Sequence, residues 1–143
     1  MKKSDFFVKC LAQGKIREFS RGRALAGKEL ALAAADLTRG WNTFKDGDYK
    51  WATVQAYYSM FHSARALLYR KNYREKSHAC LIEAMRVMYI SEGLLAAPII
   101  ESMQEAKRLR EDADYYGEFS ENIAKELLKK AEEFLNKAKE IMD

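Results

Sequence analysis

The sequence predicts an all-α fold, an up-and-down bundle of four to six helices that forms one domain over residues 1–143. Three observations support this prediction. The chain contains one proline and seven glycines, so few positions interrupt a helix. Apolar residues recur at spacings of three and four, which is the period of an amphipathic helix. No segment shows the alternating pattern of a strand, and short connections favour antiparallel neighbours.

The first 20 residues are expected to form a basic N-terminal extension or a short helix over residues 3–16. A second helix is expected over residues 21–45. Its predicted buried positions are Leu30, Ala34, Leu37, Trp41 and Phe44. The sequence Asp46-Gly47-Asp48 then predicts a turn, because glycine readily adopts the left-handed conformation that ends a helix.

Residues 51–69 are predicted to form the central buried helix. Its apolar stripe consists of Trp51, Val54, Tyr58, Phe61, Ala64 and Leu68. Tyr58, His62 and Arg65 share one side of this helix, and burying such groups is unfavourable unless they find partners. One interpretation of His62 is therefore a hydrogen-bonded core histidine. Tyr57 and Tyr58 are expected to be core aromatics with their hydroxyls at the rim.

The second half of the chain predicts three more helices. Residues 72–76 are polar and are expected to form a loop, and Ser77 has the side chain of an N-cap. The helix that follows is expected to stop at Gly93, and Pro98 lies early in the next one, where its missing N–H matters little. After a break at Gly117, Ser120 is expected to cap the last helix. The predicted buried residues of that helix are Ile123, Leu127, Phe134, Ala138 and Ile141.

The net charge of +4 is unevenly distributed. Residues 1–28 carry eight Lys or Arg against two acids, and residues 65–76 carry five against one. These two basic zones can attract a polyanion or can be solvated helix surfaces, and the sequence leaves both interpretations open. Apolar runs are too short for a signal peptide or a membrane helix. The two cysteines form no C-x-x-C pair, so a cytoplasmic protein with reduced thiols and no membrane contact is expected.

The residue types in the sequence also limit the kinds of functional site that the protein can form. The two histidines, His62 and His78, lie on different predicted helices without further ligands at metal-binding spacing, so neither a metal nor a cofactor is expected. What remains is a set of Arg, His and Tyr side chains on the central helix and near Arg108 and Arg110. Four-residue spacing allows Arg108 to pair with Asp112 and Arg110 to pair with Asp114, so a purely structural salt-bridged helix end is an alternative.

Three motifs then suggest a family. The run AYYSMFHSARALL from Ala56 to Leu68, the turn Lys76-Ser77-His78 and the segment REDADY from Arg110 to Tyr115 occur in that order. Together they resemble the HEPN superfamily, in the branch with an AYYxMFHxARALL helix, a KSH loop and an RxxADY segment. The resemblance spans residues 21–142.

The resemblance implies a helical bundle that forms a homodimer and is often encoded beside a minimal nucleotidyltransferase, as the two halves of a toxin–antitoxin system. Many members are metal-independent ribonucleases with an R-X4-6-H motif. The fifth residue after Arg110 is Tyr115 rather than histidine, so this motif is incomplete here. A tyrosine can still orient a phosphate, and His62 can supply proton chemistry from the central helix.

The resulting hypothesis is an RNA- or nucleotide-binding domain with an incomplete ribonuclease-type site. The residues predicted to take part in catalysis are Arg110, Tyr115 and His62. Those predicted to bind the substrate are Tyr58, Arg65, Arg108, Asp114 and His78. The alternative is a dimerisation or scaffold module without a ligand, in which the Arg–Asp pairs are structural.

Overall fold

The computed structural model describes residues 4–116 and 119–142, with the backbone alone for residues 113–116. The elements in chain order are α1 (Asp5–Ala12), β1 (Ile16–Glu18), α2 (Gly22–Lys45), α3 (Tyr49–Arg70), β2 (Tyr73–Glu75), α4 (His78–Met85), the π-helix η1 (Arg86–Ile90), α5 (Ala97–Tyr116) and α6 (Glu121–Met142). The predicted all-α bundle is confirmed. No helix in the described part of the chain has the length and apolar character that a membrane crossing requires.

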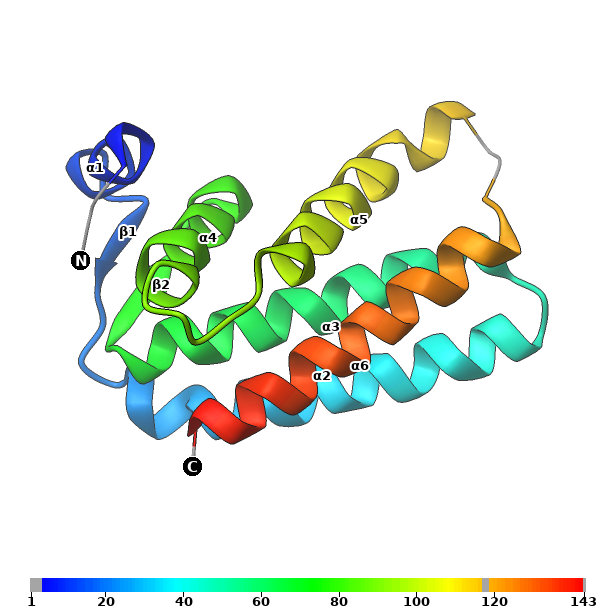
Figure 1. Cartoon of the computed structure of the whole chain (residues 1–143), viewed down its shortest axis with the longest axis horizontal. Helices are drawn as coiled ribbons and strands as arrows, with labels where there is room; N and C mark the ends of the chain where they lie inside the picture. Colours follow the sequence, from blue (N-terminus) through cyan, green and yellow to red (C-terminus); the bar gives the residue numbers. More distant parts are fainter. Residues whose placement is uncertain (1–3, 117–118, 143) are drawn as a thin grey trace.

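The long helices α2, α3 and α6 lie side by side, and α4 and α5 pack on the other side of α3 (Figure 1). α3 therefore contacts α2, α4, α5 and α6 and also the strand β2. Its small residues make this close packing feasible, since Ala52, Ala56, Ala64 and Ala66 are fully buried. The predicted central helix is thus confirmed as the core element of the bundle.

Two residues expected in the apolar stripes are exposed instead. Trp51 is 53% exposed, because Ala52, Thr53 and Val54 occupy the buried face of the first turn of α3. Ile123 is 43% exposed, because the buried stripe of α6 begins one residue later, at Ala124. Both errors lie in the first turn of a helix, where the neighbouring helices cover only part of the circumference.

The predicted helix starts and turns are present. The hydroxyl of Ser77 accepts the N–H of Cys80, and that of Ser120 accepts the N–H of Ile123. Gly47 has a φ of +83° in the turn before α3. The expected helix after Ser77 is also present, but its last part widens into η1 before Gly93.

A small sheet replaces two predicted features. Residues 72–76 were expected to be a loop, and residues 3–16 a helix, but α1 ends at Ala12 and β1 then pairs antiparallel with β2. The register joins Ile16 to Glu75, Arg17 to Arg74 and Glu18 to Tyr73. Each strand has only three residues, which is too short to show an alternating sequence pattern. The pairing attaches the N-terminal segment to the segment between α3 and α4.

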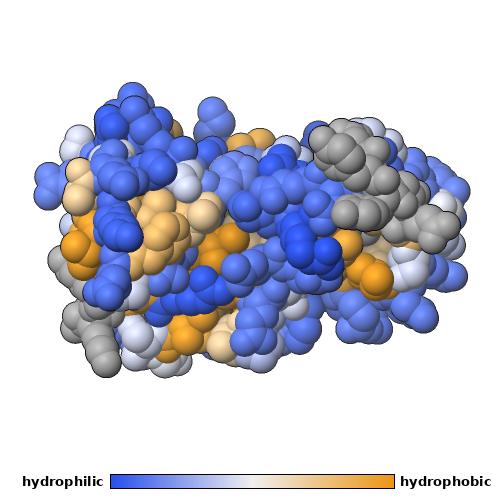
Figure 2. Space-filling model, turned by 90° about the horizontal axis from the view of Figure 1, so that it is seen from above, coloured by the Kyte–Doolittle hydropathy of each residue, from blue (hydrophilic) through white to orange (hydrophobic). Residues whose placement is uncertain are grey.

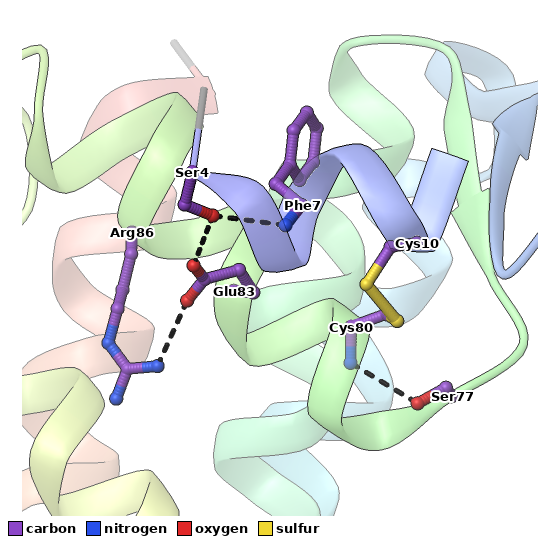
Figure 3. Close-up of a disulfide and its surroundings, with 7 residues drawn as sticks. All are labelled: Ser4, Phe7, Cys10, Ser77, Cys80, Glu83 and Arg86. Atoms are coloured by element: carbon purple, nitrogen blue, oxygen red, sulfur yellow. Dashed lines mark hydrogen bonds and ion pairs between the residues drawn. A yellow bond between two sulfur atoms is a disulfide. The ribbon is translucent and has the colours of Figure 1, made fainter. Parts of the chain in front are cut away.

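A disulfide between Cys10 and Cys80 joins α1 to α4 (Figure 3), so the expectation of reduced thiols is wrong. Both cysteines are buried, and their Cα atoms are 5.9 Å apart. Next to the disulfide, the hydroxyl of Ser4 donates to Glu83 over 2.5 Å and accepts the N–H of Phe7 (Figure 3). Sequence spacing could not reveal this pair, because the cysteines are 70 residues apart and meet only when α1 packs on α4.

The disulfide predicts a large dependence of stability on redox conditions. For a loop of this length, the chain-entropy model gives a stabilisation of about 4 kcal/mol. Reduction, or the double substitution Cys10→Ser/Cys80→Ser, should therefore lower the unfolding midpoint by roughly 10 °C. Calorimetry with and without reductant measures this shift, and the double variant, as control, should show no further response to reductant. Equal midpoints for the oxidised and reduced protein would contradict the prediction.

Candidate functional site

The polar side chains of α3 fall into two groups on opposite sides of Phe61. The Arg110 cluster consists of Tyr57, Tyr58, Phe61, His78 and Arg110. The His62 network consists of Glu29, Asp36, His62, Arg65 and Glu75. Phe61 lies between them, since its ring centre is 4.5 Å from that of His78 and 4.4 Å from the guanidinium carbon of Arg65.

Within the Arg110 cluster, a fully buried tyrosine holds His78. The hydroxyl of Tyr57 lies 2.5 Å from Nδ1 of His78, and the two rings are stacked at 5.8 Å. Burial raises the pKa of the Tyr57 hydroxyl well above its usual range, so the phenol keeps its proton. Burial, and next the positive charge of Arg110, lower the pKa of His78. Tyr57 therefore donates to Nδ1 of a neutral imidazole, whose remaining proton is on Nε2.

Arg110 lies against the same aromatic side chains. Its Nη1 donates to the hydroxyl of Tyr58 over 2.8 Å, and its guanidinium carbon is 5.1 Å from the ring centre of Tyr57 and 5.5 Å from that of Tyr58. Its Nε is buried and has no hydrogen-bond partner among the described residues. No carboxylate of the described side chains forms a salt bridge with it. A half-buried cation of this kind is costly to maintain, and it is a suitable partner for an anion.

The His62 network is neutralised by carboxylates. Nδ1 of His62 lies 2.6 Å from the buried carboxylate of Glu29, and its Nε2 lies 3.6 Å from Asp36. Arg65 bonds both oxygens of Glu75 and lies 3.8 Å from Glu29. These contacts join α2, α3 and β2. Among the described side chains, the polar contacts of His62 and Arg65 are thus to carboxylates and not to Arg110.

The remaining predicted site residues are dispersed. Arg108 is exposed and bonds Glu105 over 2.6 Å and Asp112 over 3.4 Å, so the expected Arg108–Asp112 pair is present. The side chains of Asp114 and Tyr115 lie outside the described residues, although the backbone of α5 is helical through Tyr116. The structure therefore brings Arg110, Tyr58 and His78 together, whereas the polar contacts of His62, Arg65 and Arg108 with described residues are to carboxylates outside this cluster. The roles of all these residues stay predictions.

A hollow of about 630 Å³ lies between α1, α4, η1 and α5, and its lining contains none of the five residues of the Arg110 cluster. The charged residues in its lining are Arg86, Lys107, Arg108, Glu101, Glu105 and Glu111. Figure 2 views this side of the molecule and shows apolar surface enclosed by hydrophilic side chains. The described residues contain no group of three His, Cys, Asp or Glu side chains arranged to hold a metal ion.

Sequence reasoning missed three members of these groups. It placed the Tyr57 hydroxyl at the rim, but this hydroxyl is buried against His78. It also gave no role to Glu29, whose carboxylate is buried between Ala26 and Ala33 in the stripe of α2. An acid inside a stripe of small residues is the signal that could have indicated a buried ion pair. Glu75 could not be identified, because its burial follows from the strand pairing with Ile16.

Comparison with known proteins gives consistent matches. The HEPN domain family model matches residues 30–141. Two similar proteins come from Methanocaldococcus jannaschii. The one named "Putative toxin MJ0605" is 30% identical over 79% of this chain and 85% of its own length. The one named "Putative toxin MJ0142" is 32% identical over 90% of this chain and 88% of its own length. A "UPF0332 protein" of Archaeoglobus fulgidus is 36% identical over 67% of this chain and 78% of its own length.

The lowered pKa of His78 predicts a specific pH dependence of stability. The folded-state pKa lies below the ordinary value of about 6.5, so the unfolded chain binds the proton first as the pH falls. Stability should be complete above pH 6.5 and should decrease from there down to the folded pKa. Arg110→Gln removes the second cause of the shift, so it should raise the His78 pKa and weaken this dependence.

Proton titration of the histidine rings by NMR, together with urea unfolding at pH 7.5 and 5.5, measures both effects. His62→Gln is the control and should leave the His78 titration unchanged. A His78 pKa at or above its ordinary value in the unmodified protein would contradict the assignment.

Proposed function

The chain belongs to the HEPN domain family, and on that premise we propose that it is a toxin-type protein that binds RNA or a nucleotide through phosphate at the Arg110 cluster. The observation that supports this most directly is the Arg110 guanidinium, which is fixed by Tyr58 and Tyr57 yet lacks a carboxylate partner among the described side chains. A planar guanidinium with free donors matches the oxygens of a phosphate.

The neighbouring groups fit the same ligand. Neutral His78 offers an Nε2–H donor and adds no charge that would compete with Arg110 for the anion. The aromatic rings of Tyr57, Tyr58 and Phe61 exclude water from one side of the guanidinium, which strengthens its interaction with an anion.

Binding without cleavage is the form of activity that we propose. In metal-independent cleavage, one group must remove the proton of the 2′-hydroxyl and another must protonate the leaving oxygen. The described histidines are poorly placed for this, because His78 is hydrogen-bonded to Tyr57 and His62 to Glu29. Cleavage would then depend on Tyr115 or on release of His62 from Glu29.

The scaffold alternative requires the pairs Arg108–Asp112 and Arg110–Asp114. The first pair is present, and the side chain of Asp114 lies outside the described residues. Among the described side chains, Arg110 bonds the hydroxyl of Tyr58 and no carboxylate, which supports the binding proposal. For partners, we propose a homodimer and a minimal nucleotidyltransferase, as membership of this family suggests. Light scattering of the purified protein tests the homodimer, and co-purification with a nucleotidyltransferase encoded nearby tests the second partner.

Arg110→Ala should weaken binding of a single-stranded RNA roughly ten- to hundredfold, because hydrogen bonds to a charged group contribute about 1.5–3 kcal/mol. Fluorescence anisotropy measures this change, and circular dichroism verifies that the bundle remains folded. Lys129→Ala removes an exposed cation of α6 that is not part of the Arg110 cluster and serves as the matched control with near-normal affinity. Equal affinities of the Arg110 variant and the unmodified protein would refute the proposal.

Incubation of the protein with total RNA in the presence of EDTA separates binding from cleavage. We expect bound but intact RNA. Fragmentation that persists in EDTA and disappears in Tyr115→Phe or His62→Gln would show instead that the protein is a metal-independent ribonuclease.

A further inference from the structure

The two basic zones of the sequence meet at one end of the bundle. β1 pairs with β2, the N–H of Phe19 donates to the carbonyl of Asn72 over 2.7 Å, and the N–H of Lys76 donates to that of Lys15 over 2.8 Å. Residues 15–23 therefore run beside residues 70–76. We call their basic residues the basic end: Lys15, Arg17, Arg21, Arg23, Arg70, Lys71, Arg74 and Lys76.

This contact depends on the start of α2 lying directly against the end of α3. A Cβ atom on Gly22 would collide with the carbonyl oxygen of Tyr69, so only glycine permits the approach. Asn72 has a φ of 59°, and its side chain accepts the N–H of Arg23 over 3.1 Å. The basic end is thus held by backbone contacts, although its side chains carry like charges.

These charges are not neutralised. In the part of the chain that the structure describes, none of the eight side chains forms a salt bridge, whereas Arg39, Arg65, Arg86 and Arg108 all do. The two stretches contain only two acids, Glu18 and Glu75. Glu75 is buried and bonded to Arg65, so it does not offset the charge of the surface.

Several of these cations occupy positions that lower stability. Arg17 and Arg74 are exposed and directly opposite each other in the sheet, where like charges are destabilising. Arg21 and Arg23 lie at the N-terminus of α2, whose dipole disfavours positive charge, and the first turn of α2 has no acid. Such a concentration of positive charge is typical of surfaces that bind a polyanion.

Three of the arginines are held in place without use of their terminal nitrogens. Nε of Arg17 donates to the carbonyl of Gly14 over 3.1 Å, and Nε of Arg23 donates to that of Arg70 over 3.0 Å. The guanidinium of Arg74 lies 5.2 Å from the ring centre of Phe19. Arginines ordered in this way lose less entropy when they bind phosphate oxygens.

The surface between them is hollowed and partly aromatic. One hollow of about 290 Å³ has Phe19, Tyr73, Lys71 and Glu18 in its lining, and another of about 310 Å³ is lined by Arg23, Arg70 and Met142. A surface that combines cations with aromatic side chains suits a flexible nucleic-acid strand.

We propose that the basic end binds the phosphodiester backbone of RNA. This surface is distinct from the Arg110 cluster, and the proposal does not depend on the function proposed there. Twelve residues of α3 separate Tyr58 from Arg70, a rise of about 18 Å. One RNA strand can therefore contact both surfaces.

The test is the double variant Arg17→Ala/Arg74→Ala, with binding of a 20-nucleotide single-stranded RNA and of its duplex measured at several salt concentrations. Loss of two phosphate contacts should reduce the slope of log K against log salt by about 1.4 for the single strand and weaken its binding about tenfold at 0.15 M salt. The unfolding midpoint should be preserved, because a like-charge pair has been removed. The duplex shows whether the surface also accepts a double-stranded backbone. Lys15→Ala/Lys76→Ala provides a second pair with the same expectation.

The matched control is Lys125→Ala/Lys129→Ala, which removes two exposed lysines of α6 and should change neither slope nor affinity beyond a small general effect. Equal changes in the control and the basic-end variants, or no change in either, would overturn the proposal. So would binding to vesicles with anionic lipids but not to RNA, which would assign the surface to a membrane. Arg110→Gln, measured in parallel, separates the two proposals. This variant tests the Arg110 cluster alone, whereas Arg17→Ala/Arg74→Ala tests the basic end alone.

Discussion

The burial of polar side chains on α3 is the constraint on which the rest of the structure depends. A helix that is covered by α2, α4, α5, α6 and β2 leaves its polar groups little access to bulk water, so its neighbours must supply partners. α2 supplies Glu29 for His62, β2 supplies Glu75 for Arg65, and α4 supplies His78 for Tyr57. The hydrogen-bond requirements of one helix thus fix the positions of three other elements, and apolar packing alone would not determine their register.

The two groups on α3 differ in how their charge is compensated. In the His62 network, buried carboxylates face both His62 and Arg65, so the network can hold α2 and β2 against α3 but has little remaining affinity for an anion. In the Arg110 cluster, a guanidinium is surrounded by aromatic rings and a neutral imidazole, and its Nε is unpaired among the described residues. A partly buried guanidinium without a salt bridge to any described side chain lowers stability, and such departures from local optimality are expected where a protein binds a ligand.

Helix periodicity was sufficient for the fold but not for the site. The apolar spacing located α3, α5 and α6, and Ser77 and Ser120 marked helix starts, because these signals act within a few residues. Residue types and motifs, not periodicity, suggested Tyr58, Arg110 and His78, and they gave no means to distinguish these residues from His62 and Arg65. That distinction depends on Glu29 and Glu75, whose burial arises only from tertiary contacts. The disulfide and the three-residue strands were missed for the same reason, since both join segments far apart in the chain.

The segment from Glu75 to Glu83 links the N-terminal extension to the candidate site. Glu75 bonds Arg65, His78 bonds Tyr57, Cys80 is joined to Cys10, and Glu83 accepts the hydroxyl of Ser4. The family match begins at residue 30, so α1 and β1 lie outside it and yet contact the segment that positions His78. Because α4 begins at His78, the disulfide at Cys80 lies within the first turn of the helix that carries the imidazole. The N-terminal extension is therefore connected to both proposed surfaces: it is joined covalently to α4, and it provides Lys15 and Arg17 of the basic end.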